Sequence, residues 1–446
     1  MSCVRKDELS DLDRVTIPMM VKAFVVYELL PTVDLSSLIS SLMEGLDDAT
    51  RQFPFMAGSV QVDQCGKPYI VTVLGKGVQC IIQHFAPTES PSFSKLAAGS
   101  FCPTDMDETQ LLPRLKLDEK PVCVLQLNII DGGLILGFTM HHSAGDWVSM
   151  HSFLSLICRS CQARQNGLPM PLYTPDLNKS PYNGQFVDPE TTKIGLLKKC
   201  PGYYVIDLKE SLAPKPSPPF QTCIYRTTAS AIQHLKQQFT PIKEVEYVTS
   251  YDCLSAILWK AITRARVQLR PEKSASQTRL LHPIDLRARD PEGRTSKRYF
   301  GNGVIPSQAG PLDVNVLLSE RGLATASSMI RKSINLTSMA SLQDLTLLAK
   351  TLEPTERLGY HADFHDLDIL MNTWFSGRGE DFHIGGGSLP RAFRTHRPIT
   401  GACCLVLPNF SPGDTRVYEV IVQLEVEQHS LLQMDTEFSK FFELVA

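Results

Sequence analysis

The segment that most constrains the fold is PVCVLQLNIIDGGLILGFTM at residues 121–140, in which two apolar runs flank Asp131-Gly132-Gly133. Apolar runs bounded by turn residues predict β-strands, and the glycines supply the positive φ that a tight hairpin requires. Directly afterwards, apolar residues from Val148 to Cys161 recur roughly as one helical face. A hairpin that passes straight into an amphipathic helix favours an α/β fold.

The junction between this hairpin and the helix, HHSAGDW, carries His142 and Asp146 in the spacing H-x-x-x-D. The small residues after the histidine can leave its imidazole open to a cleft, and an unperturbed imidazole is mostly neutral and basic at pH 7. His142 is therefore a candidate general base. The motif alone fits another interpretation better, in which a hydrogen-bonded core histidine precedes an aspartate that caps the helix.

Length and composition restrict the remaining options. The chain has 446 residues, 43% hydrophobic and 20% charged, which is enough for a sizeable core in two large lobes or three smaller domains. A net charge of −3 provides no overall attraction to nucleic acid or to anionic lipid. We therefore expect the protein to recognise its partners through a local site.

No targeting or spanning segment is apparent. The start, MSCVRKDELSDLD, lacks an apolar signal-peptide core, and no apolar stretch reaches the ~18 residues of a spanning helix. The 12 cysteines follow no regular framework, and Cys158-x-x-Cys161 has no second pair for zinc. We expect reduced thiols, no metal, no membrane insertion and a cytoplasmic location.

Proline distribution predicts the domain organisation. Prolines are densest at LAPKPSPPFQT, residues 212–222, which argues against a helix or a central strand there. We predict an N-terminal lobe at 1–208, a crossover linker at 209–225 and a C-terminal lobe at 226–446. Further predicted elements are helices at 36–53, 227–240 and 249–266, the last capped by Thr249 or Ser250, and a C-terminal strand followed by a helix.

Two more segments carry candidate functional residues. DLRARDPEGRTSKRYFGNGV, at 285–304, offers arginines that could pair with Asp146 and a small-residue turn around Asn302. NTWFSGRGEDFHIGGG, at 372–387, contains Trp374, Asp381 and three consecutive glycines whose backbone can approach a ligand closely. Taken singly, each segment also fits a plain loop.

Six segments of this chain resemble sequence motifs of the BAHD acyl-CoA-dependent acyltransferases and occur in the same order as in that family. The resemblance is to the fungal members in particular, which include trichothecene O-acetyltransferases. The six segments are LSDLDR, FPFMAGSV, HHSAGD, SYDCLSAILWKAITRAR, DLRARDPEGRTSKRYFGNG and DFHIGGGSLPRAFR. The resemblance implies a fold like chloramphenicol acetyltransferase, with two α/β lobes, each a mixed sheet flanked by helices, and an active-site channel between them.

The resemblance also implies roles for the residues. His142 would be the general base that takes a proton from an acceptor hydroxyl or amine as it attacks the acyl-CoA thioester, without an acyl-enzyme. Asp146 would point away from the substrate and pair with Arg287, which shapes the histidine loop. Trp374 matches a tryptophan whose indole N–H reaches the acyl oxyanion, although a packed aromatic between the lobes is an equal alternative.

Other matching positions concern support and cofactor binding. Asp381, Gly385 and Gly386 match a region that stabilises the lobe from outside the site. The CoA phosphates need cations or the amides of a helix N-terminus. The candidates are the helix start at Thr249 and Ser250 and the cations Lys297 and Arg298, although these two cations also fit a solvated basic loop. His383 and Trp147 stand where the family has glycine, and we expect them to reshape the channel.

The predicted function is transfer of an acyl group, expected to be acetyl, from acyl-CoA to a hydroxyl of a secondary metabolite such as a terpenoid, alkaloid or polyketide, by a monomer. One alternative is a free-standing condensation-type enzyme that takes acyl groups from carrier-protein pantetheine. Another is a degenerate lobe pair that serves as a binding module. DFHIGGG and YFGNG favour the first prediction.

Overall fold

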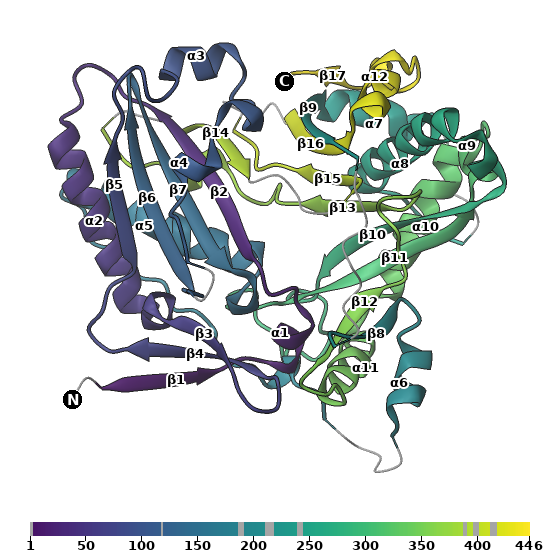
Figure 1. Ribbon diagram of the computed structural model, residues 1–446, viewed down its shortest axis with the longest axis horizontal. Coiled ribbons are helices and arrows are strands. Elements are labelled where there is room, and N and C mark those ends of the chain that lie inside the picture. Colours follow the sequence, from purple (N-terminus) through teal and green to yellow (C-terminus); the bar gives the residue numbers. More distant parts are fainter. Residues whose placement is uncertain are drawn as a thin grey trace.

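Two large β-sheets lie side by side in the computed structural model, with helices on their outer sides (Figure 1). The structure describes residues 3–116, 119–185, 191–209, 218–238, 244–386, 390–395, 401–410 and 417–446. The predicted α/β architecture of two mixed sheets flanked by helices is confirmed.

The first sheet has the strand order β14-β2-β7-β6-β5. The predicted hairpin forms as β6 and β7, which pair antiparallel from Ile130↔Gly133 onward around Gly132, whose φ is 72°. Apolar side chains of α2 and α5 pack with this sheet in one core, as the sequence pattern predicts. The elements are β2 Met20–Glu28, β5 Gln79–His84, β6 Cys123–Ile130, β7 Gly133–His141, β14 Pro390–Thr395, α2 Leu35–Gln52 and α5 Trp147–Gln165.

A smaller sheet and several short helices complete this half of the molecule (Figure 1). The strand order of the small sheet is β1-β4-β3, and all its pairs are antiparallel. The elements are β1 Val4–Glu8, β3 Ser59–Val62, β4 Pro68–Val73, α3 Phe93–Ala98 and α4 Glu108–Leu111. The short helix α1 Asp11–Val15 instead packs its apolar side chains against residues of the second half, among them Leu342 and Leu345.

The second large sheet has seven strands in the order β11-β10-β13-β15-β16-β9-β17. The helix α8 packs on it together with α7, α9, α10 and α12. The strands are β9 Phe220–Thr228, β10 Gln277–Asp285, β11 Val304–Asp313, β13 Ile369–Thr373, β15 Cys403–Val406, β16 Val417–Glu425 and β17 Glu443–Leu444. The helices are α7 Ala229–Gln237, α8 Ser250–Leu269, α9 Val314–Leu318, α10 Gly322–Leu336 and α12 Val426–Met434.

A two-stranded ribbon lies beside this sheet (Figure 1). It pairs β8 Tyr203–Asp207 with β12 Glu356–Tyr360, in antiparallel register. The helices α6 Lys193–Lys199 and α11 Met339–Lys350 pack against each other nearby. The ribbon therefore joins a segment before the predicted crossover to one far into the second half of the chain.

Two observations bear on the predicted organisation. Strand β9 starts at Phe220, so the exclusion of a strand from all of 212–222 is wrong for its last three residues. The prolines end at Pro219, and every later residue of the segment has a backbone donor. Strand β14 pairs with β2 although it lies far beyond the crossover in sequence. Residues 210–217 of the predicted linker lie outside the described residues, and the boundaries at 208 and 226 stay a prediction.

The structure also bears on the thiols. The 12 cysteines, all within the described residues, form no disulfide bond, and nine of them are buried. No helix within the described ranges is both long enough and apolar enough to cross a membrane.

Candidate active site

His142 lies at the junction between β7 and α5, as predicted. Its backbone N–H donates to the Met19 carbonyl at 2.8 Å, and its carbonyl accepts from Nδ2 of Asn302 at 2.9 Å. The side chain is partly exposed, while its Nδ1 is buried and has no hydrogen-bond partner within the described chain. Hydrogen bonds of its backbone to Met19, just before β2, and to the Asn302 side chain, in the turn before β11, therefore fix this histidine.

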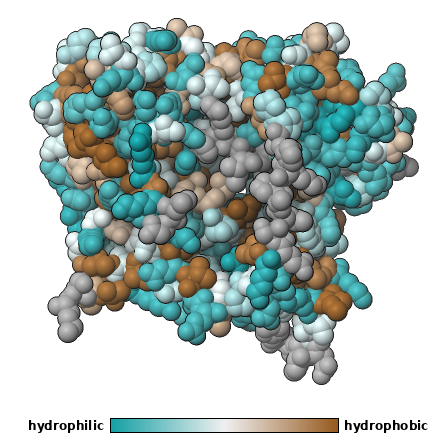
Figure 2. Space-filling view, viewed as in Figure 1, coloured by the Kyte–Doolittle hydropathy of each residue, from teal (hydrophilic) through white to brown (hydrophobic). Residues whose placement is uncertain are grey.

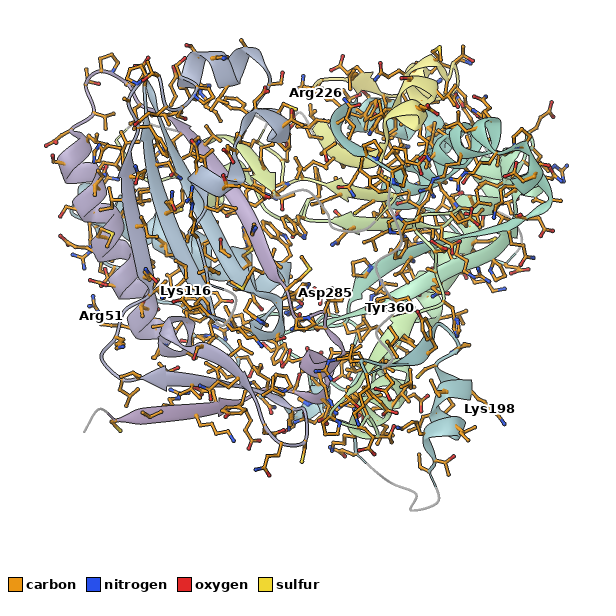
Figure 3. The ribbon with its side chains drawn as sticks, in the orientation of Figure 1. Arg51, Lys116, Lys198, Arg226, Asp285 and Tyr360 are labelled. Atoms are coloured by element: carbon orange, nitrogen blue, oxygen red, sulfur yellow. The ribbon has the colours of Figure 1, made fainter. Side chains whose placement is uncertain are left out.

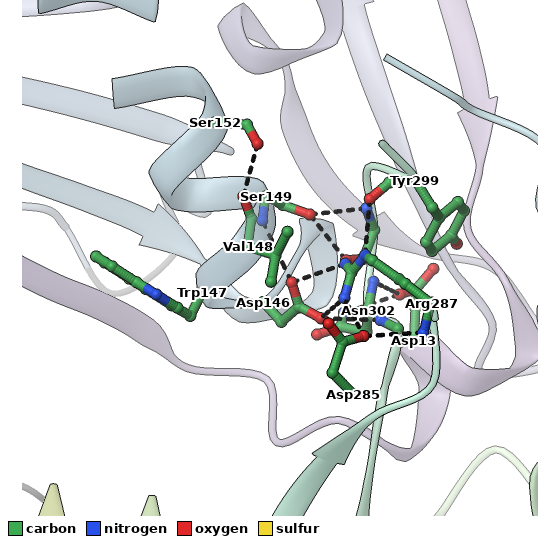
Figure 4. Close-up of polar contacts among 12 residues, drawn as sticks. Asp13, Asp146, Trp147, Val148, Ser149, Ser152, Asp285, Arg287, Tyr299 and Asn302 are labelled. Atoms are coloured by element: carbon green, nitrogen blue, oxygen red, sulfur yellow. Dashed lines mark hydrogen bonds and ion pairs between the residues drawn. The ribbon is translucent and has the colours of Figure 1, made fainter. Parts of the chain in front are cut away.

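Asp146 is the N-cap of α5 and also half of a buried ion pair (Figure 4). Its Oδ1 accepts from the Ser149 backbone N–H at 3.3 Å, and its two oxygens accept from Nη1 and Nη2 of Arg287, both at 2.9 Å. The side chains are 4% and 2% exposed. The predicted pairing is therefore present, in the two-pronged geometry that suits a guanidinium and a carboxylate.

Further hydrogen bonds complete the surroundings of Arg287. Nε donates to the Tyr299 carbonyl at 3.0 Å, Nη2 to the Gly301 carbonyl at 2.9 Å and Nη1 to Asp285 at 3.1 Å. Burial alone would lower the pKa of Arg287, but the adjacent Asp146 carboxylate outweighs it and raises that pKa above its ordinary value. The arginine therefore stays charged and ties the β10–β11 connection to the start of α5.

The small-residue turn after Phe300 lets this connection approach α5. The Gly303 N–H donates to Asp146 at 2.9 Å, and a Cβ on Gly303 would lie 2.6 Å from Nη1 of Arg287. Ser149 exchanges two hydrogen bonds of 2.9 Å with the Gly301 backbone. A side chain at position 303 would therefore displace the guanidinium, which explains glycine there.

The buried chain from Ser10 through Asp13 to Asn302 was not predicted. Asp13 accepts from Nδ2 of Asn302 at 2.8 Å and from Ser10 Oγ at 2.7 Å, and the same Nδ2 contacts the His142 carbonyl. Burial raises the pKa of Asp13, against the opposing effects of Lys179, Asn302 and Ser10. Asp13 and Asn302 lie in two of the segments that resemble the family. No local sequence pattern predicts a contact between positions so far apart in the chain.

Trp374 follows β13 and stacks on Trp147, with ring centroids 4.7 Å apart and planes at 7°. Trp147 also meets Phe393 of β14 edge-on at 5.3 Å, and its Nε1 donates to Ser376 at 3.1 Å. A Cβ on Gly377 would lie 2.9 Å from the Trp147 ring. These contacts match the alternative prediction for Trp374, an aromatic packed between the two halves, and its oxyanion role stays a prediction.

Asp381 also contacts α5. Its Oδ2 lies 3.0 Å from His151 Nε2 and accepts from the Arg378 backbone N–H at 2.9 Å. Burial would raise the pKa of Asp381, but these hydrogen bonds outweigh it and lower that pKa. Asp381 therefore connects the segment after Trp374 to α5, and its supporting role stays a prediction.

The glycines after Asp381 and the residue His383 form a second contact with α5. Gly385 and Gly386 have φ values of 92° and 66°, which favour glycine. A Cβ on Gly385 would lie 2.4 Å from Gln165. His383 Nδ1 lies 3.2 Å from Gln162 Nε2 and 3.0 Å from the Gly385 amide, and burial lowers the His383 pKa. These glycines therefore allow the chain to pass close to α5.

The predicted CoA-binding residues occupy two places. Thr249 caps α8 in a capping box with Asp252, which also pairs with Arg331 at 2.7 Å, and Ser250 is the first helical residue. Lys297 and Arg298 are exposed in the loop that leads to Tyr299. The Asp252 carboxylate thus already lies in the first turn of α8, while Lys297 and Arg298 face solvent.

Known proteins resemble this chain over almost its whole length. The sequence matches the Transferase family over residues 5–439. It is 22% identical to a trichothecene 3-O-acetyltransferase of Fusarium sporotrichioides, over 94% of this chain and 92% of that protein. The structure of F. sporotrichioides TRI101 with coenzyme A and T-2 superposes with a TM-score of 0.81 at 20% identity, covering 99% of this chain and 100% of that one.

Another relative is longer. An enoyl-CoA isomerase/hydratase of Penicillium crustosum is 23% identical over 97% of this chain, but the chain spans only about half of that protein, 50% of its length. The chain belongs to the Transferase family, which corresponds to the BAHD resemblance of the sequence, and it is an acyltransferase.

Proposed function

We propose that this enzyme transfers an acetyl group from acetyl-CoA directly to a hydroxyl of a secondary metabolite, with His142 as the general base. The observation that carries the proposal is the Arg287–Asp146 ion pair, which fixes the loop of His142 at the junction of β7 and α5. Relatives named as O-acetyltransferases of fungal metabolites support the donor and the acceptor class. The proposal includes a monomer in the cytoplasm.

The proposed chemistry begins with a proton transfer. Because Nδ1 of His142 is buried, we assign Nε2 as the nitrogen that accepts the proton of the acceptor hydroxyl. The oxygen attacks the thioester carbon, and the tetrahedral oxyanion collapses to the ester as the carbon–sulfur bond breaks. The coenzyme A thiolate then takes the proton from His142. The protein forms no covalent bond to the acetyl group, and its base returns to the neutral state.

Two further assignments belong to the proposal. The Trp374 indole N–H would donate to the oxyanion, and one such donor typically contributes ~3 kcal/mol to transition-state stabilisation. The backbone N–H of Thr249 already donates to Asp252 at 2.6 Å, so the CoA phosphates would contact the Ser250 amide at the start of α8 and the side chains of Lys297 and Arg298. The partial positive charge at the start of the long helix α8 and the exposure of the two cations support this assignment.

The proposal is tested by calorimetric titration of the purified chain with acetyl-CoA, followed by single-turnover transfer. The chain should bind acetyl-CoA, and His142→Ala should keep that binding but lose transfer by at least about a hundredfold. The control is His84→Ala, which removes an exposed histidine outside the site and should leave both unchanged. Intact-protein mass spectrometry after mixing should detect no acetylated chain.

The same assay separates the proposal from the condensation-type alternative. A chain that ignores acetyl-, malonyl- and longer acyl-CoA but accepts the acyl group from a pantetheinylated carrier protein would contradict the proposed donor. Full transfer by His142→Ala, or an acetylated protein of catalytic competence, would contradict the proposed mechanism.

A further inference from the structure

A cavity of about 940 Å³ lies in the second half of the molecule, away from the described contacts of His142. One wall is the β8–β12 ribbon, and the other is the β10–β11 hairpin with the end of α10. Tyr360, at the end of β12, lies near the middle of the molecule in Figure 3. A volume of this size is within the range of small-molecule sites, which is about 300–1,000 Å³.

The ribbon wall is aromatic. Tyr203 and Tyr360 are cross-strand partners with ring centroids 5.3 Å apart, and Tyr204 lies 5.0 Å from His361. All four residues line the cavity. Such a wall offers flat ring faces and edges, which favour a ligand that contains rings.

The opposite wall mixes apolar and neutral polar groups. Leu281 of β10 and Ile305 of β11 are buried, and Gln308 is partly exposed beside them. Nε2 of Gln308 donates to the Gly202 carbonyl at 3.2 Å, which holds the amide across the space between the hairpin and the ribbon. This wall suits the hydrocarbon body of a ligand that carries a few oxygen atoms.

The charges of the lining argue against a polyanion. Arg279 lies 3.8 Å from Asp368, and Lys199 lies 3.4 Å from Asp344, so each of these two lining cations already has a carboxylate close by. Asp363 adds another acid to the lining. The diphosphate and 3′-phosphate of CoA would meet these carboxylates without a free cation among the described lining residues, whereas an uncharged ligand meets no such cost.

The strands that line the cavity lead to the catalytic loop. Asn302, which contacts the His142 carbonyl, precedes Ile305 of the cavity lining by three residues. At the limit of about 3.3 Å per extended residue, Asn302 and Ile305 lie at most on the order of 10 Å apart. A recess with hydrophobic residues in it opens near the middle of the face in Figure 2.

We propose that this cavity holds the body of the acceptor, an uncharged ring-containing alcohol whose hydroxyl lies on the order of 10 Å from its ring system. The proposal rests on the proposed acetyl transfer, since it assigns the cavity to the second substrate of that reaction. Gln308 and Tyr360 then determine acceptor specificity from opposite walls, and neither belongs to the binding of CoA.

The test uses two fluorescent alcohols, 6-(2-naphthyl)hexan-1-ol and the shorter 2-(2-naphthyl)ethanol, with Gln308→Trp as the main variant. A tryptophan there should fill part of the cavity, and a β-strand accepts it well. Tyr360→Ala removes the opposite wall and serves as the second variant. The control is Gln277→Trp, the same substitution at an exposed residue of the same hairpin outside the lining.

The wild-type chain should bind the hexanol probe and acetylate it with a kcat/KM about tenfold above that of the ethanol probe. Gln308→Trp should raise the Kd of the hexanol probe about tenfold and keep the Kd of acetyl-CoA within about twofold, while Gln277→Trp changes neither. Probe binding is read by fluorescence, so it stays measurable if acetyl transfer fails.

Three results would overturn the assignment. They are no binding of either probe to the wild type, equal use of both alcohols, and a Gln308→Trp variant that weakens acetyl-CoA binding while probe binding is unchanged. Failure of the proposed function has a different signature, because acetyl-CoA would then bind neither the wild type nor any variant, whatever the naphthyl probes do.

Discussion

Removal of Arg287 tests how the ion pair with Asp146 shapes the loop that carries His142. Arg287→Ala leaves the Asp146 carboxylate buried, with only the Gly303 and Ser149 amides of its present partners. Breaking a buried pair in this way typically costs about 3–5 kcal/mol of unfolding free energy. Asp146→Asn should cost less, about 1–3 kcal/mol, because Arg287 keeps the Tyr299 and Gly301 carbonyls and Asp285.

The measurement is a double-mutant cycle by urea denaturation, followed by tryptophan fluorescence and by circular dichroism. The double variant should cost less than the sum of the single variants by about 2 kcal/mol, since neither charge then remains unpaired. Arg287→Lys should recover part of the loss, because an ammonium keeps the charge but not the two-pronged geometry.

The control for this cycle is Arg294→Ala. Arg294 lies in the same loop, is half exposed and pairs with Asp290 and Glu292, so its loss should lower the free energy of unfolding far less than the loss of Arg287. The reasoning is refuted if Arg287→Ala costs no more than Arg294→Ala, or if the effects of the two single variants of the cycle simply add.

The remaining predictions concern the histidine loop, the aromatic contact and pH. Asn302→Ala should lower kcat at least about tenfold with little change in the Kd of acetyl-CoA, because the His142 carbonyl loses its hydrogen-bond partner. The same variant should lower the free energy of unfolding by about 1–3 kcal/mol in urea denaturation. An unchanged kcat would contradict this role of Asn302. Trp147→Leu should cost about 1–3 kcal/mol through its stacking and packing, which urea midpoints would reveal, whereas an unchanged midpoint would exclude a stabilising stack. Burial lowers the pKa of His141 to about 4 and of His282 to about 3, below the unfolded value. The unfolded chain therefore binds more protons than the folded chain as the pH falls below about 6.5. Each histidine should lower the free energy of unfolding by about 2 kcal/mol at pH 5 relative to pH 7. His282→Gln should reduce this pH dependence, and an identical slope would contradict it.

Much of the local structure follows from the sequence alone. The apolar runs on either side of two glycines at 121–140 specify the hairpin, because glycine adopts without strain the positive φ that a tight turn between antiparallel strands requires. Asp146 caps α5 and Thr249 caps α8 as their positions predict, since a capping side chain contacts amides within three residues. Such signals depend on neighbours in the chain, so they can be read without the fold.

The long-range contacts of the site required the tertiary structure. Asp13 and Asn302 are separated by 289 positions, and their hydrogen bond depends on how α1 packs beside the turn before β11. The pairing of β14 with β2 and the stack of Trp147 on Trp374 also join segments that are far apart in the sequence. Propensity and periodicity describe residues a few positions apart, whereas these contacts arise from the packing of whole elements, which no local pattern specifies. The sequence by itself thus determined which residues can do chemistry, and the tertiary structure decided which of them meet.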